Sequence, residues 1–173
     1  MKISIVTVCY NSEATIKKCV DSVASQSYAD IEHIIIDGSS TDSTVAVAST
    51  SASDNIKIFS EADDGIYDAM NKGFEKATGD VVAYLNSDDY YSHPEVIRNV
   101  MAKFENDNID YVYGDIYYVN DALVRVRSWV VGEIKEGQLR SQQIPHPAFF
   151  CRRNAIQKLS TPFDRTLKIC GDL

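Results

Sequence analysis

The chain has 173 residues, a formal net charge of −8 and 45% hydrophobic residues, which suits one folded domain with a sizeable core. This negative charge argues against binding to long nucleic acid, because such binding needs a basic face. It leaves open the binding of a single nucleotide whose phosphates are neutralised by a metal ion. No stretch approaches the roughly 20 apolar residues of a membrane span, and no signal peptide is visible at the N-terminus.

The cysteines give no sign of a disulfide framework or a metal finger. Cys9, Cys19, Cys151 and Cys170 contain no CxxC pair, so we expect buried free thiols in a reducing compartment. The three histidines lack the spacing of a zinc site. We therefore expect a cytoplasmic protein. The inner face of the cytoplasmic membrane, reached through an acceptor or a partner, stays open as a second location.

The first half of the chain alternates predicted strands and helices. The expected strands are β-branched or apolar runs, and they span residues 3–9, 31–36, 56–59 and 81–85. The expected helices between and after them have one apolar face each, and they begin near residues 12, 42, 66 and 94. Short links and strict alternation predict an α/β fold with a parallel sheet covered by helices.

The helix starts carry recognisable signals. Asn11 or Ser12 can cap the first helix, because their side chains accept hydrogen bonds from free backbone N–H groups. Ser92 and Glu95 have the spacing of a capping box, with Pro94 in the first turn, which predicts a helix from there to about residue 104.

The second half has a different pattern. Residues 111–119 and 123–131 are neighbouring β-rich runs joined by Asn120 and Asp121, which predicts a hairpin appended to the sheet. The tyrosines of residues 111–118 favour packing over a sugar-binding platform, which remains the alternative. Residues 145–150 predict a short strand and residues 153–159 a short helix. We expect no second domain.

Two adjacent acids, Asp88 and Asp89, follow the fourth predicted strand. Neighbouring carboxylates repel each other unless solvent or a cation lies between them. A hard divalent ion with oxygen ligands, Mg²⁺ or Mn²⁺, would relieve this repulsion. The alternative is an acidic turn that only ends the strand.

Polar residues follow every strand of the first half. Ligands of open α/β sheets bind beyond the carboxyl ends of the strands, so these residues are expected to meet in one pocket. They are Tyr10 and Asn11 after the first strand, Asp37 after the second, Glu61 and Asp63 after the third, and Asp88 and Asp89 after the fourth. Such a pocket would contain an aromatic ring, several hydrogen-bond acceptors and a metal site.

Several common motifs are absent. The turn after the first strand has no GxGxxG, which argues against a dinucleotide site, and the chain has no phosphate loop of the GxxxxGK[ST] type. No GxSxG elbow of a serine hydrolase occurs. A nucleotidyltransferase would be expected to carry a glycine-rich basic loop after the first strand, and this chain has none.

Several blocks together resemble family 2 glycosyltransferases, which have the GT-A fold. The blocks are residues 4–11, 36–44, 61–73, 78–89, 146–150 and 169–173. The likeness is strongest to members of the colanic-acid type, which build bacterial surface polysaccharides. It implies inverting, metal-assisted transfer of a sugar from a nucleotide-sugar, by default a UDP-sugar, to a hydroxyl of a saccharide or lipid-linked saccharide. Two other interpretations stay open: a non-catalytic nucleotide- or sugar-binding module, and a nucleotidyltransferase.

The resemblance assigns the nucleotide side of the site to the first half of the chain. Tyr10 and Asn11 would lie near the base and ribose. Asp37 would contact the base, and Glu61 and Asp63 would line the nucleoside pocket. Oligomeric state is not indicated.

The resemblance also assigns the reacting groups. Asp88 would contact the ribose or the metal, and Asp89 would hold Mg²⁺ or Mn²⁺ on the diphosphate. Asp172 would be the general base that takes the proton of the attacking hydroxyl. His146 would lie near the diphosphate or the acceptor.

The chain departs from the family pattern at three places. Asn86 and Gly38 stand where many members have an acid, so the metal site would rest on the later acids and the base contact on Asp37. The chain ends one residue after Asp172, whereas members continue with a further helix, so we expect a missing C-terminal continuation. Within a single domain of residues 1–173, we expect residues 1–90 to bind the nucleotide and residues 91–173 to form the acceptor side.

Overall fold

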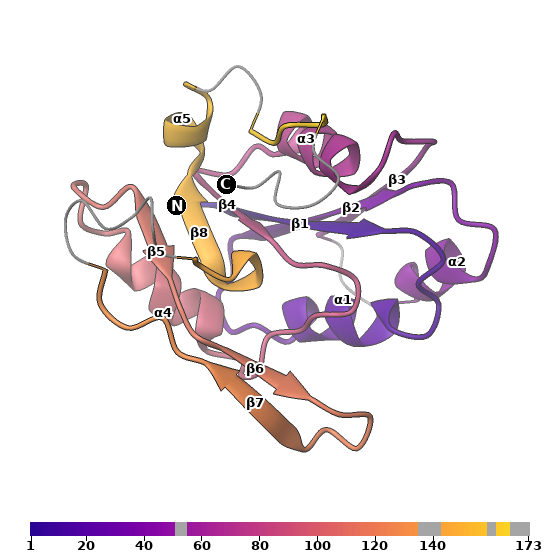
Figure 1. Ribbon diagram of the computed structural model, residues 1–173. Helices are drawn as coiled ribbons and strands as arrows, with labels where there is room; N and C mark the ends of the chain where they lie inside the picture. The colour runs from indigo at the N-terminus through magenta and orange to yellow at the C-terminus, as the bar shows by residue number, and fades with distance from the viewer. Residues whose placement is uncertain (51–54, 135–142, 159–161, 167–173) are drawn as a thin grey trace.

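The centre of the fold is a six-stranded, mostly parallel sheet with strand order β3-β2-β1-β4-β8-β5. A computed structural model describes residues 1–50, 55–134, 143–158 and 162–166 (Figure 1). The strands of this sheet are β1 (Ile3–Cys9), β2 (Ile31–Asp37), β3 (Ile56–Ser60), β4 (Val81–Tyr84), β5 (Tyr111–Tyr113) and β8 (Phe149–Arg152). The helices are α1 (Ile16–Ala24), α2 (Thr44–Ala48), α3 (Ile66–Lys76), α4 (Val96–Lys103), α5 (Arg153–Ile156) and the short 3-10 helix η2 (His146–Ala148). The predicted α/β architecture is confirmed.

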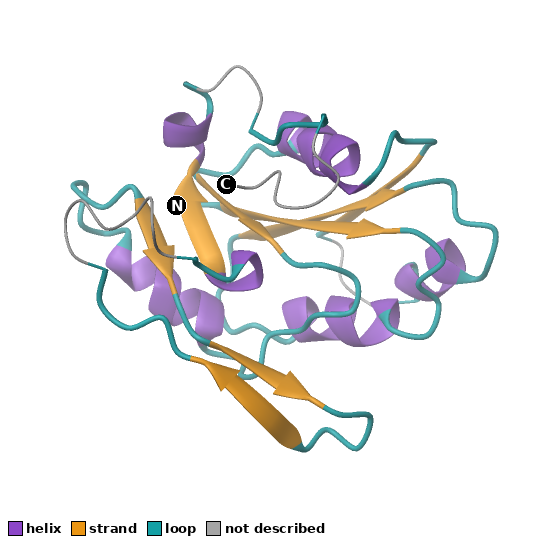
Figure 2. Cartoon of the chain, in the orientation of Figure 1, coloured by secondary structure: helices purple, strands orange, loops and turns teal. Residues whose placement is uncertain are grey.

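Helices cover both faces of this sheet, with α3 on one face and α1, α2 and α4 on the other (Figure 2). Every residue of β1 is buried, because its side chains alternate between two apolar layers. Val6 and Val8 pack with α3, whereas Ile3 and Ile5 pack with α1 and α4. Gly73 lets α3 approach closely, since a Cβ there would collide with a methyl group of Val6.

The second half is only partly as predicted. A hairpin does form, from β6 (Ile116–Val119) and β7 (Arg125–Trp129), but it is a separate two-stranded sheet. The expected single strand over residues 111–119 is wrong: it breaks at Gly114 and Asp115, and β5 pairs antiparallel with β8 instead. In Figure 1 the hairpin extends away from the helices and the central sheet.

The predicted helix caps are also wrong. Helix α1 begins at Ile16 and helix α4 at Val96, and neither has a side-chain cap from its own N-cap residue. For α4 the cap comes from a distant residue: the Ile97 N–H donates to Gln26 Oε1 at 3.0 Å. The Gln26 amide also donates to the carbonyl of His93 at 3.0 Å. Gln26 therefore fixes the start of α4 from the end of α1.

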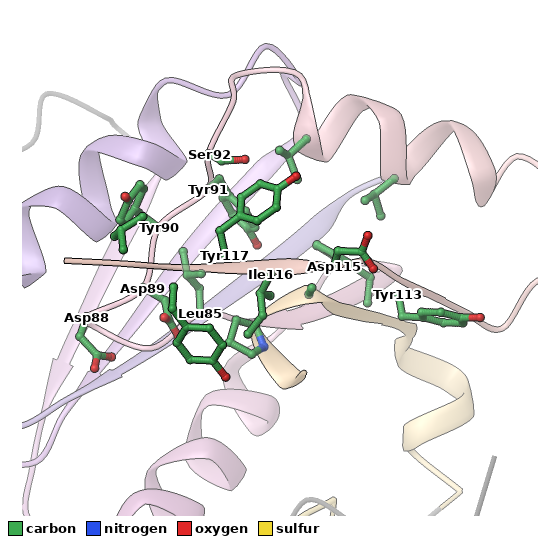
Figure 3. A pocket seen from close by; sticks show the side chains of 18 residues that line it. Leu85, Asp88, Asp89, Tyr90, Tyr91, Ser92, Tyr113, Asp115, Ile116 and Tyr117 are labelled. Atoms are coloured by element: carbon green, nitrogen blue, oxygen red, sulfur yellow. The ribbon is translucent and has the colours of Figure 1, made fainter. Parts of the chain in front are cut away.

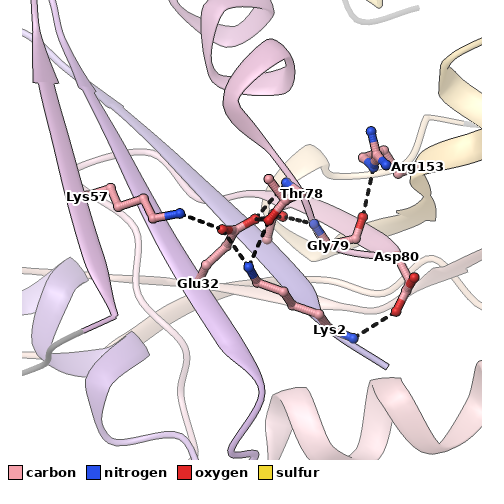
Figure 4. A network of polar contacts seen from close by, with 8 residues as sticks. Lys2, Glu32, Lys57, Thr78, Gly79, Asp80 and Arg153 are labelled. Atoms are coloured by element: carbon pink, nitrogen blue, oxygen red, sulfur yellow. Dashed lines mark hydrogen bonds and ion pairs between the residues drawn. The ribbon is translucent and has the colours of Figure 1, made fainter.

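A polar network joins the strands at the edge of the sheet where β1 and β2 begin (Figure 4). Glu32 of β2 forms ion pairs with Lys2 at 2.8 Å and Lys57 at 3.2 Å, and it accepts hydrogen bonds from Ser4 and Thr78. Burial alone would raise the pKa of Glu32, but these bonds outweigh it and hold the pKa far below its usual range. The network therefore ties β1, β2, β3 and the start of β4 together.

Cys9, Cys19 and Cys151 are buried and unpaired, which confirms the expected free thiols for these three; Cys170 lies outside the described residues. Burial raises the pKa of Cys9 and of Cys19 to about 12. Within the described ranges, no helix combines the length and apolar character that crossing a bilayer requires.

Candidate functional site

Four loops leave the sheet at the same edge. Cys9, Asp37 and Ser60 stand in register on β1, β2 and β3, and Tyr84 at the end of β4 pairs opposite Val6 of β1. The strand order reverses around β1, because β2 and β3 lie on one side of it and β4 on the other. Loops that part at such a reversal open the crevice in which α/β sheets bind ligands. The structure therefore brings the polar strand ends to one edge of the sheet, and their meeting in one pocket stays a prediction.

The loop after β1 is held against its neighbours on both sides. Asn11 has a φ of 49°, a conformation that asparagine tolerates, and its Oδ1 accepts from the Thr41 N–H at 2.9 Å. On the other side, the hydroxyl of Ser87 donates to that of Ser12 at 2.9 Å. The side chain of Tyr10 is 63% exposed beyond the strand end. This loop thus presents an aromatic ring at the switch point from a fixed backbone.

Asp37 is completely buried at the end of β2. Its Oδ2 accepts from the Ser60 hydroxyl at 2.6 Å and from the Ser40 N–H at 3.0 Å, and its Oδ1 accepts from the Ser40 hydroxyl. These bonds satisfy the buried carboxylate oxygens and fix the loop that begins at Gly38. Because Asp37 is buried, it acts on the site through the loop that it holds. Its contact with a nucleotide base stays a prediction.

Asp63 lies directly beside Gly38. A Cβ on Gly38 would stand 2.6 Å from Asp63 Oδ2 and 3.5 Å from the Tyr10 ring. The absence of a side chain at Gly38 therefore makes the space that the Asp63 carboxylate occupies next to Tyr10. The Gly65 N–H holds Asp63 Oδ1 at 2.9 Å, so this carboxylate is oriented.

Glu61 is the most open of the predicted acids on this side. Its side chain is 52% exposed, and Lys72 lies 3.9 Å from its Oε1. The Lys72 ammonium also donates to the carbonyl of Ala62 at 2.7 Å, so it braces the loop between β3 and α3. The structure brings Tyr10, Asp63 and Glu61 to one edge of the sheet.

Asp88 and Asp89 line a cavity of about 380 Å³ beside the end of β4 (Figure 3). Asp88 is exposed, whereas Asp89 is half-buried. Burial, and then the charge of Asp88, raises the pKa of Asp89 to about 6. The repulsion that the sequence predicted for this pair is therefore present in the structure.

Asn86 and His146 meet behind this acid pair. Asn86 Nδ2 lies 3.0 Å from His146 Nε2, and this contact joins the loop after β4 to η2. Asn86 Oδ1 is buried without a hydrogen-bond partner. An orphaned amide oxygen is a hard ligand of the kind that Mg²⁺ and Mn²⁺ prefer.

The donor set fits a divalent ion that is completed by a ligand. In the part of the chain that the structure describes, no group of three His, Cys, Asp or Glu side chains could hold a metal alone. Mg²⁺ is usually held by one or two carboxylates together with substrate phosphates and waters. The acid pair suits such a shared site, and the unpaired amide oxygen of Asn86, in the same loop after β4, is a further hard donor.

Asp172, the predicted general base, lies outside the described residues. The segment that precedes it is partly described: residues 162–166 lie against α3. Asn71 donates from Nδ2 to the Phe163 carbonyl at 2.9 Å and accepts from the Phe163 N–H at 3.1 Å. Arg165 pairs with Asp68 at 2.8 Å.

Sequence reasoning missed two features of this region. Nothing in the sequence around Asp68 indicates that this residue is buried and ion-paired with Arg165. Tyr117 and Tyr118 read as packing residues, but both are exposed and line the cavity beside Asp88. Two consecutive large aromatics on a strand cannot share one buried face, and that lack of alternation is the signal that would have found the tyrosines.

Comparisons with known proteins agree with this geometry. Residues 4–158 match the family model described as glycosyl transferase family 2. A "PGL/p-HBAD biosynthesis glycosyltransferase" of Mycobacterium tuberculosis is 30% identical in an alignment of 173 positions that covers 98% of this chain. The chain spans 66% of the length of that relative.

Two solved structures resemble the fold closely. TarS of S. aureus in complex with UDP-GlcNAc has a TM-score of 0.84 and 22% identity, covering 99% of this chain and 51% of that one. The mannosyltransferase PcManGT of Pyrobaculum calidifontis, in complex with GDP-Man and Mn²⁺, has a TM-score of 0.75 and 17% identity, covering 96% and 48%. These likenesses confirm the predicted GT-A fold. Because the family model matches most of the length of the chain, the chain belongs to glycosyl transferase family 2.

Proposed function

We propose that the chain transfers a sugar from a nucleotide-sugar to an acceptor hydroxyl with the help of a divalent cation, in the synthesis of a bacterial polysaccharide or glycolipid. The observation that carries this proposal is the acid pair Asp88 and Asp89, which follows β4 at the switch point of a family 2 fold and also lines a cavity. One relative is named for PGL/p-HBAD biosynthesis, and the two solved neighbours are complexes with UDP-GlcNAc and with GDP-Man and Mn²⁺, which support a nucleotide-sugar donor.

We assign the nucleotide to the half formed by residues 1–90 and the acceptor to residues 91–173 of one domain. Tyr10 offers an open ring for stacking a base, and the oriented carboxylate of Asp63 lies beside it. Uridine is the preferred base in this proposal. The unpaired thiols of Cys9, Cys19 and Cys151 support a reducing, cytoplasmic location.

In the proposed reaction the acceptor oxygen forms a bond to the anomeric carbon while the bond to the nucleoside diphosphate breaks, which inverts the anomeric centre. The electron pair leaves with the diphosphate, and the hydroxyl proton passes to a carboxylate, which we assign to Asp172. A cation held by Asp88, Asp89 and the oxygen of Asn86 would stabilise the negative charge of the departing diphosphate. Asp37 fixes the loop that faces the nucleoside.

Substitution of the acid pair tests the cation site. We expect Asp88→Asn and Asp89→Asn each to weaken Mn²⁺-dependent UDP binding by about tenfold or more, because the cation loses a charged ligand. Isothermal titration with UDP and GDP, with and without Mn²⁺, measures this. Asp107→Asn is the matched control, since that side chain is fully exposed on another loop. UDP affinity that is unchanged in both variants would argue decisively against the proposed site.

Asp172→Asn separates an enzyme from a non-catalytic binding module. We expect this variant to retain donor binding and to lose transfer by a factor of about 100 or more, because the attacking hydroxyl has no base. Release of UDP from a UDP-sugar in the presence of acceptor gives the rate. Equal rates for the variant and the unsubstituted chain would remove Asp172 from the mechanism.

A further inference from the structure

The lining of the cavity beside Asp88 and Asp89 does not include Tyr10, Asp37 or Asp63 of the other strand ends. Its other walls come from α4, from the chain between β5 and β6, and from the segment of η2 and β8. A cavity of about 380 Å³ falls within the usual range of small-ligand pockets. In the proposed reaction the acid pair faces the diphosphate, so the remainder of this cavity is the space open to the second substrate.

The wall of the cavity is rich in tyrosine. Five tyrosines line it, and two of them, Tyr117 and Tyr118 of β6, are 52% and 39% exposed. Neighbours on a strand point to opposite faces, so the edge of β6 projects into the cavity and offers a ring on either side. Behind these rings lie Arg125, 3.9 Å from the centre of the Tyr117 ring, and Arg127, 5.2 Å from that of Tyr118. Such cation–π contacts hold the rings in place.

The charge of the wall is uniformly negative. Its charged side chains, among the residues that the structure describes, are Asp88, Asp89 and Asp115, and Arg125 and Arg127 are not part of the lining. Figure 3 shows the acid pair and Asp115 on opposite sides of Tyr117. When a cation occupies the acid pair, Asp115 remains as the unneutralised charge among the described lining residues, and it repels a phosphorylated or carboxylated ligand beside it.

A purely apolar ligand fits no better. It would strip water from Asp115 and from several tyrosine hydroxyls without replacing their hydrogen bonds, which is costly. A sugar ring matches both kinds of wall, because its C–H face packs on an aromatic ring and its hydroxyls donate to carboxylates. The walls thus select a ligand that is uncharged, hydroxyl-rich and flat on one face.

From these walls we infer that the cavity is the acceptor subsite and that it takes an uncharged saccharide, with a sugar ring against Tyr117 or Tyr118 and hydroxyls on Asp115. This inference rests on the proposed function and names the substrate class of its second substrate. It makes the β6–β7 hairpin an acceptor-specificity element.

The single tryptophan of the chain provides a reporter of this subsite. Trp129 of β7 pairs with Ile116 of β6, and Ile116 lines the cavity. Its emission is therefore expected to change when a saccharide contacts β6. No label is needed, and UDP binding on the other side of the acid pair can be measured separately.

The full chain, saturated with UDP and Mn²⁺, is first tested for binding on an array of neutral and anionic bacterial glycans. The glycans that bind best are then titrated in solution, with Trp129 emission as the signal. We expect binding among neutral glycans only, and a loss of about tenfold or more in Tyr117→Ala or Tyr118→Ala, the size found when an anchoring aromatic is truncated. Tyr111→Ala is the matched control, because that exposed tyrosine stacks on Tyr113 and Phe149 and does not line the cavity.

A second variant keeps the test decisive if the tyrosine variants unfold. Asp115 is exposed, and we expect Asp115→Lys to admit anionic glycans that the unsubstituted chain rejects. The inference would be overturned if the chain kept its UDP affinity but bound only anionic glycans, or bound no neutral glycan. It would also be overturned if both tyrosine variants kept their affinity for neutral glycans. If the unsubstituted chain did not bind UDP at all, the proposed function itself would be refuted.

Discussion

His33 lies inside the sheet with 1% of its surface exposed, and its Nε2 is 2.8 Å from the Thr7 hydroxyl. Its Nδ1 has no hydrogen-bond partner. Burial lowers the pKa of His33 from 6.5 to about 4, because the imidazolium loses its solvation. Below pH 6.5 the unfolded chain binds a proton that the folded chain does not. The contribution of this residue to stability is therefore complete above pH 6.5, falls as the pH drops, and levels off below pH 4.

Urea unfolding of the unsubstituted chain and of His33→Gln at pH 7 and pH 4.5 measures this effect. The change in pKa predicts that the free energy of unfolding falls by roughly 2.4 kcal/mol more in the unsubstituted chain between pH 7 and pH 4.5, because nearly two of the 2.5 pH units between the unfolded and folded pKa values are crossed. The comparison cancels the slopes of the other titrating groups. Parallel pH dependence in the two proteins would show that His33 is not the titrating group.

At the scale of elements, the start of α4 depends on Gln26. Truncation in Gln26→Ala removes the acceptor of the Ile97 N–H and a donor to the His93 carbonyl, so we expect a loss of about 2 kcal/mol. Ser92→Ala should cost less than about 0.5 kcal/mol, because Ser92 is exposed and does not cap the helix. Urea unfolding at neutral pH compares the two. The capping box that the sequence predicts requires the opposite order.

Helix α4 shows which features could be predicted from the sequence and which could not. The strands β1, β2 and β4 were predictable because they are continuous apolar runs, and such runs have one place in an α/β fold. The cap of α4 was not, since Gln26 lies 71 residues before Ile97 and no local pattern joins them. The break at Gly114 was equally hidden, because residues on both sides favour strands and only their partners differ.

The candidate site was predictable to the same depth. The polar strand ends were read correctly as one edge of the sheet, because parallel strands bring their carboxyl ends together. Their individual surroundings were not readable. Full burial of Asp37 under Ser40 and Ser60, and the approach of Asp63 to Gly38, depend on loop geometry that composition does not encode. Asp172 lies outside the described residues and stays a prediction.

At the scale of the whole molecule, α3 holds a segment that lies more than ninety residues further along the chain. The amide of Asn71 makes two hydrogen bonds with the backbone of Phe163, whose ring packs edge-on against Tyr84 at 4.8 Å. The hydrogen bond from Arg165 lowers the pKa of Asp68. Together these contacts fix the chain ahead of Asp172 on the same face of the sheet as α3.

We expect Asn71→Ala to release this segment. Loss of two hydrogen bonds shifts the local opening equilibrium by about 1–2 kcal/mol, so trypsin should cleave after Arg165 about tenfold faster. Asn99→Ala is the control, because Asn99 is exposed on α4. Mass spectrometry of the early fragments gives both rates. Equal cleavage rates would mean that Asn71 does not hold the segment.

This attachment constrains the two positions that it joins in different ways. Asn71 binds main-chain atoms of Phe163, but the ring of that residue packs on Tyr84, so we expect residue 163 to vary only among apolar side chains and residue 71 to tolerate few substitutes. The neighbouring ion pair joins two side chains, and Asp68 also pairs with Lys72 at 3.2 Å, so Arg165 should tolerate more substitutions than Asp68. A saturation library of this chain would therefore record intolerant sites at 68 and 71, an apolar preference at 163 and a more tolerant site at 165.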